Sequence, residues 1–151
     1  MCGFPVRLGW KRTGPLRRIS ALPTASLRLG ATLKDPLSQV VSNWAGLGEE
    51  RMAVSVICEA EVLQGLIELG SARLWKLYQE VLVGRLPVLP VNEAVARAYA
   101  ELSAGCRKAG RTKPPFDLII AATAKTHRLI LATCNLKHFV GLPGLAVEDW
   151  S

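Results

Sequence analysis

From residue 35 onward, short apolar runs alternate with segments of helical periodicity, and this alternation restricts the architectures open to the chain. The runs at residues 53–57, 86–91, 129–132 and 145–147 have the length of strands, and the first is rich in β-branched residues. Strands that alternate with helices form a parallel sheet covered on both faces. The sequence therefore predicts an α/β domain of three layers, a small parallel sheet flanked by helices.

Capping residues mark the helices between these runs. We expect helices over residues 35–45, 59–69, 74–82, 93–108 and 116–126. Asp35 followed by proline, and Asn92, are residue types that begin helices. Glycine follows close behind four of these helices and is favoured where a helix ends. The run at 86–91 has proline at its margins, which favours a place near the edge of the sheet.

The net charge of +7 is confined to the start of the chain. Residues 1–34 carry seven basic side chains and no acid, whereas residues 35–151 are balanced. Such a segment could contact nucleic acid or an anionic surface, act as a targeting segment, or be an unstructured or wrongly translated leader. We expect residues 1–34 to be a basic leader, poorly ordered or atypical, and residues 35–151 to form the domain.

Length and composition exclude several other classes of protein. At 151 residues with half of them hydrophobic, the chain is expected to form one folded domain. No apolar run approaches the ~20 residues of a membrane span, so we expect no membrane partner. The four cysteines are widely spaced, which favours unpaired thiols in a reducing cytoplasm over a disulfide framework or a zinc ribbon.

Asp117 is the charged residue that most needs an explanation. It lies in the first turn of a helix whose next seven residues are apolar or small, so the helix is expected to be nearly buried. The structural alternative is stabilisation by the helix dipole. Because Pro114 and Pro115 already provide a helix start, we favour a carboxylate held at the rim of an acidic site.

Glu61 borders the apolar stripe of the helix at 59–69, whereas Glu59 is expected to be solvated. A carboxylate beside a buried face is costly unless it is paired or bound to a cation. Taken alone, an ordinary surface glutamate is the better interpretation. Glu61 nevertheless follows one predicted strand, and polar residues that follow parallel strands gather at the same edge of the sheet.

Asn135 and Thr133 lie just beyond the strand at 129–132 and offer amide and hydroxyl oxygens to that same edge. The alternative for Asn135 is a simple loop with an Asx turn. His127 and His138 are too far from each other and from cysteines to form a zinc pair. We interpret both histidines as surface or loop residues and neither as a general base.

Carboxylate and amide oxygens without histidine or cysteine select Mg²⁺ or Mn²⁺, which can activate water for attack on a phosphodiester. A basic stretch ends four residues before Asp117 and could contact phosphates, although a solvated helix end and loop is an equal alternative. Its members are Arg107, Lys108, Arg111 and Lys113.

Three segments resemble the motifs of PIN-domain ribonucleases of the VapC toxin type. Residues 60–65, A-E-V-L-Q-G, are similar to the family's A-E-[LV]-x-x-G signature. Residues 117–124, D-L-I-I-A-A-T-A, resemble its D-x-x-I-A-A-T-A helix start. Residues 133–139, followed by P-G-L at 143–145, look like its T-x-[ND]-x-x-x-F ending. Order and spacing agree over roughly residues 50–150.

The resemblance implies a PIN fold and a cytoplasmic ribonuclease that depends on Mg²⁺ or Mn²⁺. It implies RNA as substrate, a VapB-type antitoxin as partner and frequently a homodimer. Carried over by position, Glu61 and Asp117 would be catalytic carboxylates that hold the metal. Asn135 would take the fourth acidic place as a further metal ligand, supported by Thr133.

The chain departs from the family in its first motif, a strand that ends in L-D-T-[NS] and supplies a principal metal ligand. Pro23 stands where that aspartate is expected, and a proline side chain cannot bind a metal. The first acid of the chain, Asp35, fits a helix cap better. Three hypotheses stay open: an active endoribonuclease toxin, a catalytically impaired PIN module that binds RNA or an antitoxin, and an unrelated α/β domain with structural acids.

Overall fold

The computed structural model describes residues 18–21, 52–81, 83 and 86–150. In chain order its elements are β1 (Arg18–Ala21), β2 (Met52–Ser55), α3 (Val56–Leu69), α4 (Ala72–Val81), β3 (Val88–Leu89), α5 (Glu93–Lys108), α6 (Pro115–Thr126), β4 (Ile130–Thr133), α7 (Leu136–Phe139) and β5 (Val147–Asp149). Every strand and helix expected within these residues is present, with ends shifted by a few residues. The helix expected at 35–45 lies outside them. The strand β1 and the short helix α7 were not expected.

The five strands form one parallel sheet in the order β3-β2-β1-β4-β5. The prediction of a parallel α/β sheet is therefore confirmed, as is the edge position of the proline-flanked run, because β3 is an outer strand. Successive strands are added on opposite sides of β1. The strands β2 and β3 extend the sheet on one side of β1, whereas β4 and β5 extend it on the other.

The central strand β1 comes from the basic opening segment. Its residues pair with β2 on one side and with β4 on the other, in the registers Arg18 to Met52 and Arg18 to Ile130. The sheet thus reaches into the segment that we expected to precede the domain. The other residues of 1–34 lie outside those that the structure describes.

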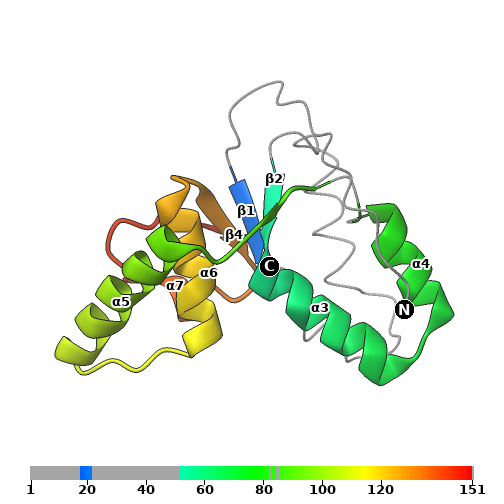
Figure 1. Cartoon of the computed structure of the whole chain (residues 1–151). Coiled ribbons are helices and arrows are strands. Elements are labelled where there is room, and N and C mark those ends of the chain that lie inside the picture. The colour runs from blue at the N-terminus through cyan, green and yellow to red at the C-terminus, as the bar shows by residue number, and fades with distance from the viewer. Residues whose placement is uncertain (1–17, 22–51, 82, 84–85, 151) are drawn as a thin grey trace.

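Helices lie on either side of the strands. Figure 1 shows α3 and α4 on one side of the sheet and α5, α6 and α7 on the other. All four residues of β2 are fully buried, as parallel strands covered on both faces require. The helix α6 buries six of its twelve residues and packs chiefly against α5. None of the helices in the described residues has the length and apolar character of a membrane span.

Local sequence explains where the helices around the site begin. Ser55 ends β2 and caps α3, because its side-chain oxygen accepts a hydrogen bond of 3.2 Å from the backbone N–H of Ile57. Asn92 caps α5 in the same way, as predicted, by accepting from Val95. The helix α6 has no side-chain cap and starts with Pro115, whose fixed φ suits the first helical position.

Candidate active site

The candidate site lies where the strand order reverses. In open parallel sheets, ligands bind outside the carboxyl ends of the strands at such a switch point. At this edge Thr133 of β4 pairs in register with Ala21 of β1 and with Asp149 of β5. Asn135 lies two residues after Thr133, and Glu61 lies on the helix that follows β2. The sheet thus positions residues from distant parts of the chain.

Asp117 occupies the third position of α6, and 19% of its side chain is exposed. Its carboxylate lies at the amino end of the helix, where unpaired backbone N–H groups favour negative charge. The five residues from Ile120 to Ala124 fix the helix against the core because each is buried. Asp117 is therefore a carboxylate held by a rigid element at the edge of the sheet.

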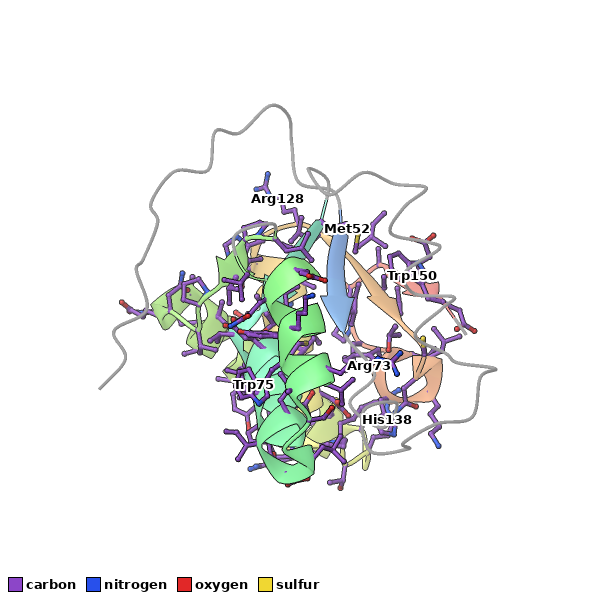
Figure 2. All side chains as sticks on the ribbon, turned by 90° about the vertical axis from the view of Figure 1, so that its right-hand side faces the viewer. Met52, Arg73, Trp75, Arg128, His138 and Trp150 are labelled. Atoms are coloured by element: carbon purple, nitrogen blue, oxygen red, sulfur yellow. The ribbon has the colours of Figure 1, made fainter. Side chains whose placement is uncertain are left out.

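His138 is the residue at this site that the sequence analysis missed. It lies on α7 (Figure 2), and its Nδ1 is 2.7 Å from Oδ2 of Asp117, with 33% of the histidine side chain exposed. From the sequence, His138 was interpreted as a surface or loop residue; the structure places it on a helix, partly exposed and in contact with Asp117. A signal was available in the spacing, because Asn135 and His138 are three residues apart and share one face of a helical turn.

Asn135 and Thr133 connect this pair to the end of β4. The side-chain nitrogen of Asn135 is 2.9 Å from Nδ1 of His138. The backbone N–H of Asn135 donates a hydrogen bond of 3.0 Å to Oγ1 of Thr133, which is 3% exposed. Asn135 is the residue that precedes α7, but its side chain does not cap that helix. Thr133 thus orients the backbone of Asn135, and Asn135 meets the histidine that contacts Asp117.

Glu61 lies half-buried on α3, close enough to Asp117 for their charges to interact. Burial raises the pKa of the Glu61 carboxyl, and repulsion from the Asp117 carboxylate raises it further. A divalent cation bound between the two carboxylates would relieve the repulsion that Glu61 experiences. The two acids that the sequence singled out are therefore within electrostatic reach of each other.

Glu59 is not solvated as expected. Its Oε1 accepts a hydrogen bond of 2.8 Å from the hydroxyl of Tyr78 on α4, so it serves the contact between α3 and α4. Two residues farther along the same helix, Glu61 makes no such structural bond within the described residues. This difference between neighbouring glutamates favours Glu61 as the residue that is available to a ligand.

The four basic residues near the site have different environments. Arg107 and Lys108 are exposed in the last turn of α5, and Arg111 is exposed in the loop that follows. The guanidinium of Arg111 lies against Gly141, just after α7: a Cβ on Gly141 would be 2.8 Å from Nη1. The ammonium of Lys113 instead donates to the backbone carbonyl of Lys137, at 3.1 Å. Within the part of the chain that the structure describes, Arg107, Lys108 and Arg111 have no hydrogen-bonding or ion-pair partner and could meet a phosphate, whereas Lys113 has a partner.

The side-chain oxygen atoms of Glu61, Asp117 and Asn135 are of the type that binds a magnesium or manganese ion. Mg²⁺ is commonly held by one or two carboxylates, with waters and substrate phosphates completing its shell. Glu61 and Asp117 provide two carboxylates, and Asn135 provides an amide. Among the residues that the structure describes, no three histidine, cysteine, aspartate or glutamate residues form a metal-binding group. Pro23, where the family's first aspartate was expected, lies outside these residues, two positions after β1 ends at Ala21.

Comparison with known proteins decides the family. Residues 29–140 match the PIN domain family. The chain belongs to that family. Among curated relatives, this PIN-domain chain is 30% identical over 105 residues to the tRNA(fMet)-specific endonuclease VapC of Shigella flexneri, covering 70% of this chain and 80% of the relative. It is 31% identical over 107 residues to ribonuclease VapC1 of Haemophilus influenzae strain R2866, covering 70% and 78%.

A solved structure agrees with the fold. The crystal structure of DNA-bound VapBC from Salmonella typhimurium superposes with a TM-score of 0.72 at 25% identity, covering 89% of this chain and 99% of that chain. The recognition of a VapC-type PIN domain from the sequence motifs is thereby confirmed. The roles of individual site residues stay predictions.

Proposed function

We propose that this chain is a metal-dependent endoribonuclease, the toxin of a VapBC-type toxin–antitoxin pair. The observation that carries the proposal is the meeting of Asp117 and Glu61 at the switch point of a PIN-domain sheet. The relatives that share this fold along most of their length are named as endonucleases and ribonucleases. RNA as substrate, a VapB-type antitoxin as partner, a homodimeric state and a cytoplasmic location are parts of the same proposal.

In this proposal Glu61 and Asp117 hold a Mg²⁺ or Mn²⁺ ion, with Asn135 as a further oxygen ligand. When bound, such an ion polarises a phosphoryl oxygen and lowers the pKa of a coordinated water. The protein's own contribution is to fix the two carboxylates on α3 and α6. The raised pKa of Glu61 is consistent with this assignment, because burial and then repulsion from Asp117 disfavour its charge, and a bound cation would offset both effects.

The exposed cations of the α5–α6 connection would orient the RNA. Arg107, Lys108 and Arg111 can contact phosphates, which carry most of the affinity of nucleic-acid complexes but no sequence information. They precede α6, so a backbone that follows them approaches Asp117 at the amino end of that helix. This placement supports cleavage of an RNA strand that the loop holds by its phosphates.

A second candidate function rests on Pro23. If the first strand supplies no carboxylate, the site has less negative charge to hold a hard cation. The chain would then be a catalytically impaired PIN module that binds RNA or an antitoxin. The position of Pro23, two residues beyond the carboxyl end of the central strand, is the specific observation that favours this alternative.

An RNA cleavage assay separates the two. Bulk tRNA is incubated with wild type, Asp117→Ala and Pro23→Asp, each with Mg²⁺ and with EDTA, and Glu101→Gln on the exposed face of α5 serves as control. We expect Mg²⁺-dependent cleavage by wild type and the control, and none by Asp117→Ala. Cleavage that persists in Asp117→Ala would overturn the nuclease proposal. Cleavage only by Pro23→Asp would favour the impaired module.

A further inference from the structure

The contact between His138 and Asp117 suggests a role for a residue outside the expected ligand set. We propose that His138 is a positioning residue: its Nδ1–H fixes one oxygen of the Asp117 carboxylate, so that the other oxygen is directed to the metal. This inference rests on the proposed function, in which Asp117 is a metal ligand. The 2.7 Å distance between Nδ1 and Oδ2 is that of a strong, charge-assisted hydrogen bond.

Hydrogen-bond accounting identifies which atom carries the hydrogen. Nδ1 of His138 lies within hydrogen-bond distance of both Asp117 Oδ2 and the Asn135 amide, at 2.7 and 2.9 Å. A ring nitrogen either donates or accepts. A bare Nδ1 would place its lone pair against a carboxylate oxygen, which is repulsive. Nδ1 therefore carries the hydrogen, and the Asn135 amide turns its oxygen toward the ring, a half-turn that leaves its shape unchanged.

With this assignment one N–H serves two acceptors. The hydrogen of His138 Nδ1 is shared between the carboxylate of Asp117 on α6 and the amide oxygen of Asn135 at the end of β4. The histidine thus ties two separate elements of the site together. Asn135 would then have a second role besides that of a metal ligand, because it contacts Asp117 through the imidazole ring of His138.

The helix that carries His138 is anchored on both sides of it. Phe139, the next residue, is 2% exposed and packs into the core. The preceding residue, Lys137, offers its carbonyl to the ammonium of Lys113, which belongs to the loop before α6. A four-residue helix is too short to be stable alone. These contacts hold the imidazole in place, so its position is determined by the fold and not by the helix.

The test uses two amide variants that differ in where they place a donor. The amide nitrogen of His138→Asn falls near the position of Nδ1, and that of His138→Gln falls near Nε2. His127→Gln, on the residue that ends α6 far from Asp117, is the matched control. The measurement is Mn²⁺ affinity of the full chain by calorimetry without RNA, together with the ¹⁵N spectrum of the metal-free wild type.

We expect His138→Asn and the control to bind Mn²⁺ within about threefold of wild type, and His138→Gln to lose about tenfold or more, as for other partners that orient metal ligands. We also expect a hydrogen on Nδ1. Equal affinities of His138→Asn and His138→Gln would overturn the proposal, and so would a wild-type spectrum with the hydrogen only on Nε2. A hydrogen found only on Nε2 of the wild type overturns the proposal even if a variant fails to fold.

Failure of the proposed function has a different signature. If wild type and Asp117→Ala bind Mn²⁺ equally, Asp117 is not a metal ligand, and the metal-dependent nuclease proposal fails. The spectrum then still reports whether His138 donates to Asp117 through Nδ1. A hydrogen on Nδ1 in that case would support the contact but assign it to stability, which overturns the positioning role.

Discussion

The charge of Glu61 has an electrostatic cost in the folded protein. Because burial and Asp117 raise its pKa, the folded chain binds its proton more tightly than the unfolded chain, in which the value is near 4.5. The folded state therefore loses stability as the pH rises from about 4.5 through the raised pKa. Below that window the carboxyl is protonated in both states and the cost is absent.

Replacing Glu61 with glutamine removes this cost. We expect Glu61→Gln to be more stable than wild type at pH 7 in EDTA, and the gain to shrink as the pH falls below 4.5. Urea unfolding at both pH values measures it, with exposed Glu80→Gln as control. A gain that is the same at both pH values would show that the charge of Glu61 is not its cause.

Asp117 and His138 show how far single residues could be predicted. Asp117 was found because one charge interrupts an apolar helix, which is a local signal. His138 was missed because its partner lies 21 residues away and its helix has only four residues. No periodicity is measurable over so short a segment. Contacts that depend on the packing of α7 against α6 become visible only when the fold is known.

At the scale of elements, α3 and α4 are joined by a buried tyrosine. Tyr78 is 8% exposed, and its hydroxyl donates to Glu59 at 2.8 Å. Its ring meets that of Trp75 edge to face, with centroids 5.9 Å apart. Burial and the bond to Glu59 raise the pKa of the Tyr78 hydroxyl, so it stays a donor at any physiological pH.

We expect Tyr78→Phe to lower the free energy of unfolding by about 1–2 kcal/mol, because it removes the donor and leaves a half-buried carboxylate without its partner. Chemical denaturation measures the loss. Tyr99→Phe on α5 is the matched control, since the described part of the chain shows no hydrogen bond from its hydroxyl. A loss of equal size in both variants would contradict a specific contribution from the bond to Glu59.

The elements themselves were predictable to different degrees. Capping residues and proline located α5 and α6 because these signals act within a few residues. The strand β1 was not predicted, because residues 1–34 were expected to be a poorly ordered or atypical leader that departs from the family's first motif near Pro23. Its four residues, R-I-S-A, include one β-branched residue and carry little local preference for a strand. Pairing with β2 and β4 on both sides supplies what the local sequence lacks.

At the scale of the whole molecule, the distribution of charge bears on the proposed RNA binding. In the described residues, Arg107, Lys108 and Arg111 are exposed to solvent. The ammonium of Lys113 instead donates a hydrogen bond to the backbone carbonyl of Lys137. Each phosphate contact with single-stranded RNA contributes about 0.7 to the slope of log affinity against log salt. Exposed and internally bonded cations should therefore differ in this slope.

We expect Arg107→Ala, Lys108→Ala and Arg111→Ala each to reduce the slope by about 0.7. Lys113→Ala should leave it nearly unchanged. Filter binding of a single-stranded RNA across a salt series, in EDTA to prevent cleavage, provides the measurement. A reduction in Lys113→Ala as large as in the other three would mean that its ammonium leaves the Lys137 carbonyl to contact RNA.

The central position of β1 has a consequence for how the chain is made. Its neighbours are β2 and β4, and the register that joins Arg18 to Ile130 spans more than a hundred residues. A ribosome releases β1 well before β4, and pairing at such separation is slow. The switch point between β1 and β4, where Asn135 lies, therefore cannot form before β4 has left the ribosome. An enzyme that cleaves RNA would in this way stay inactive during the synthesis of most of this domain.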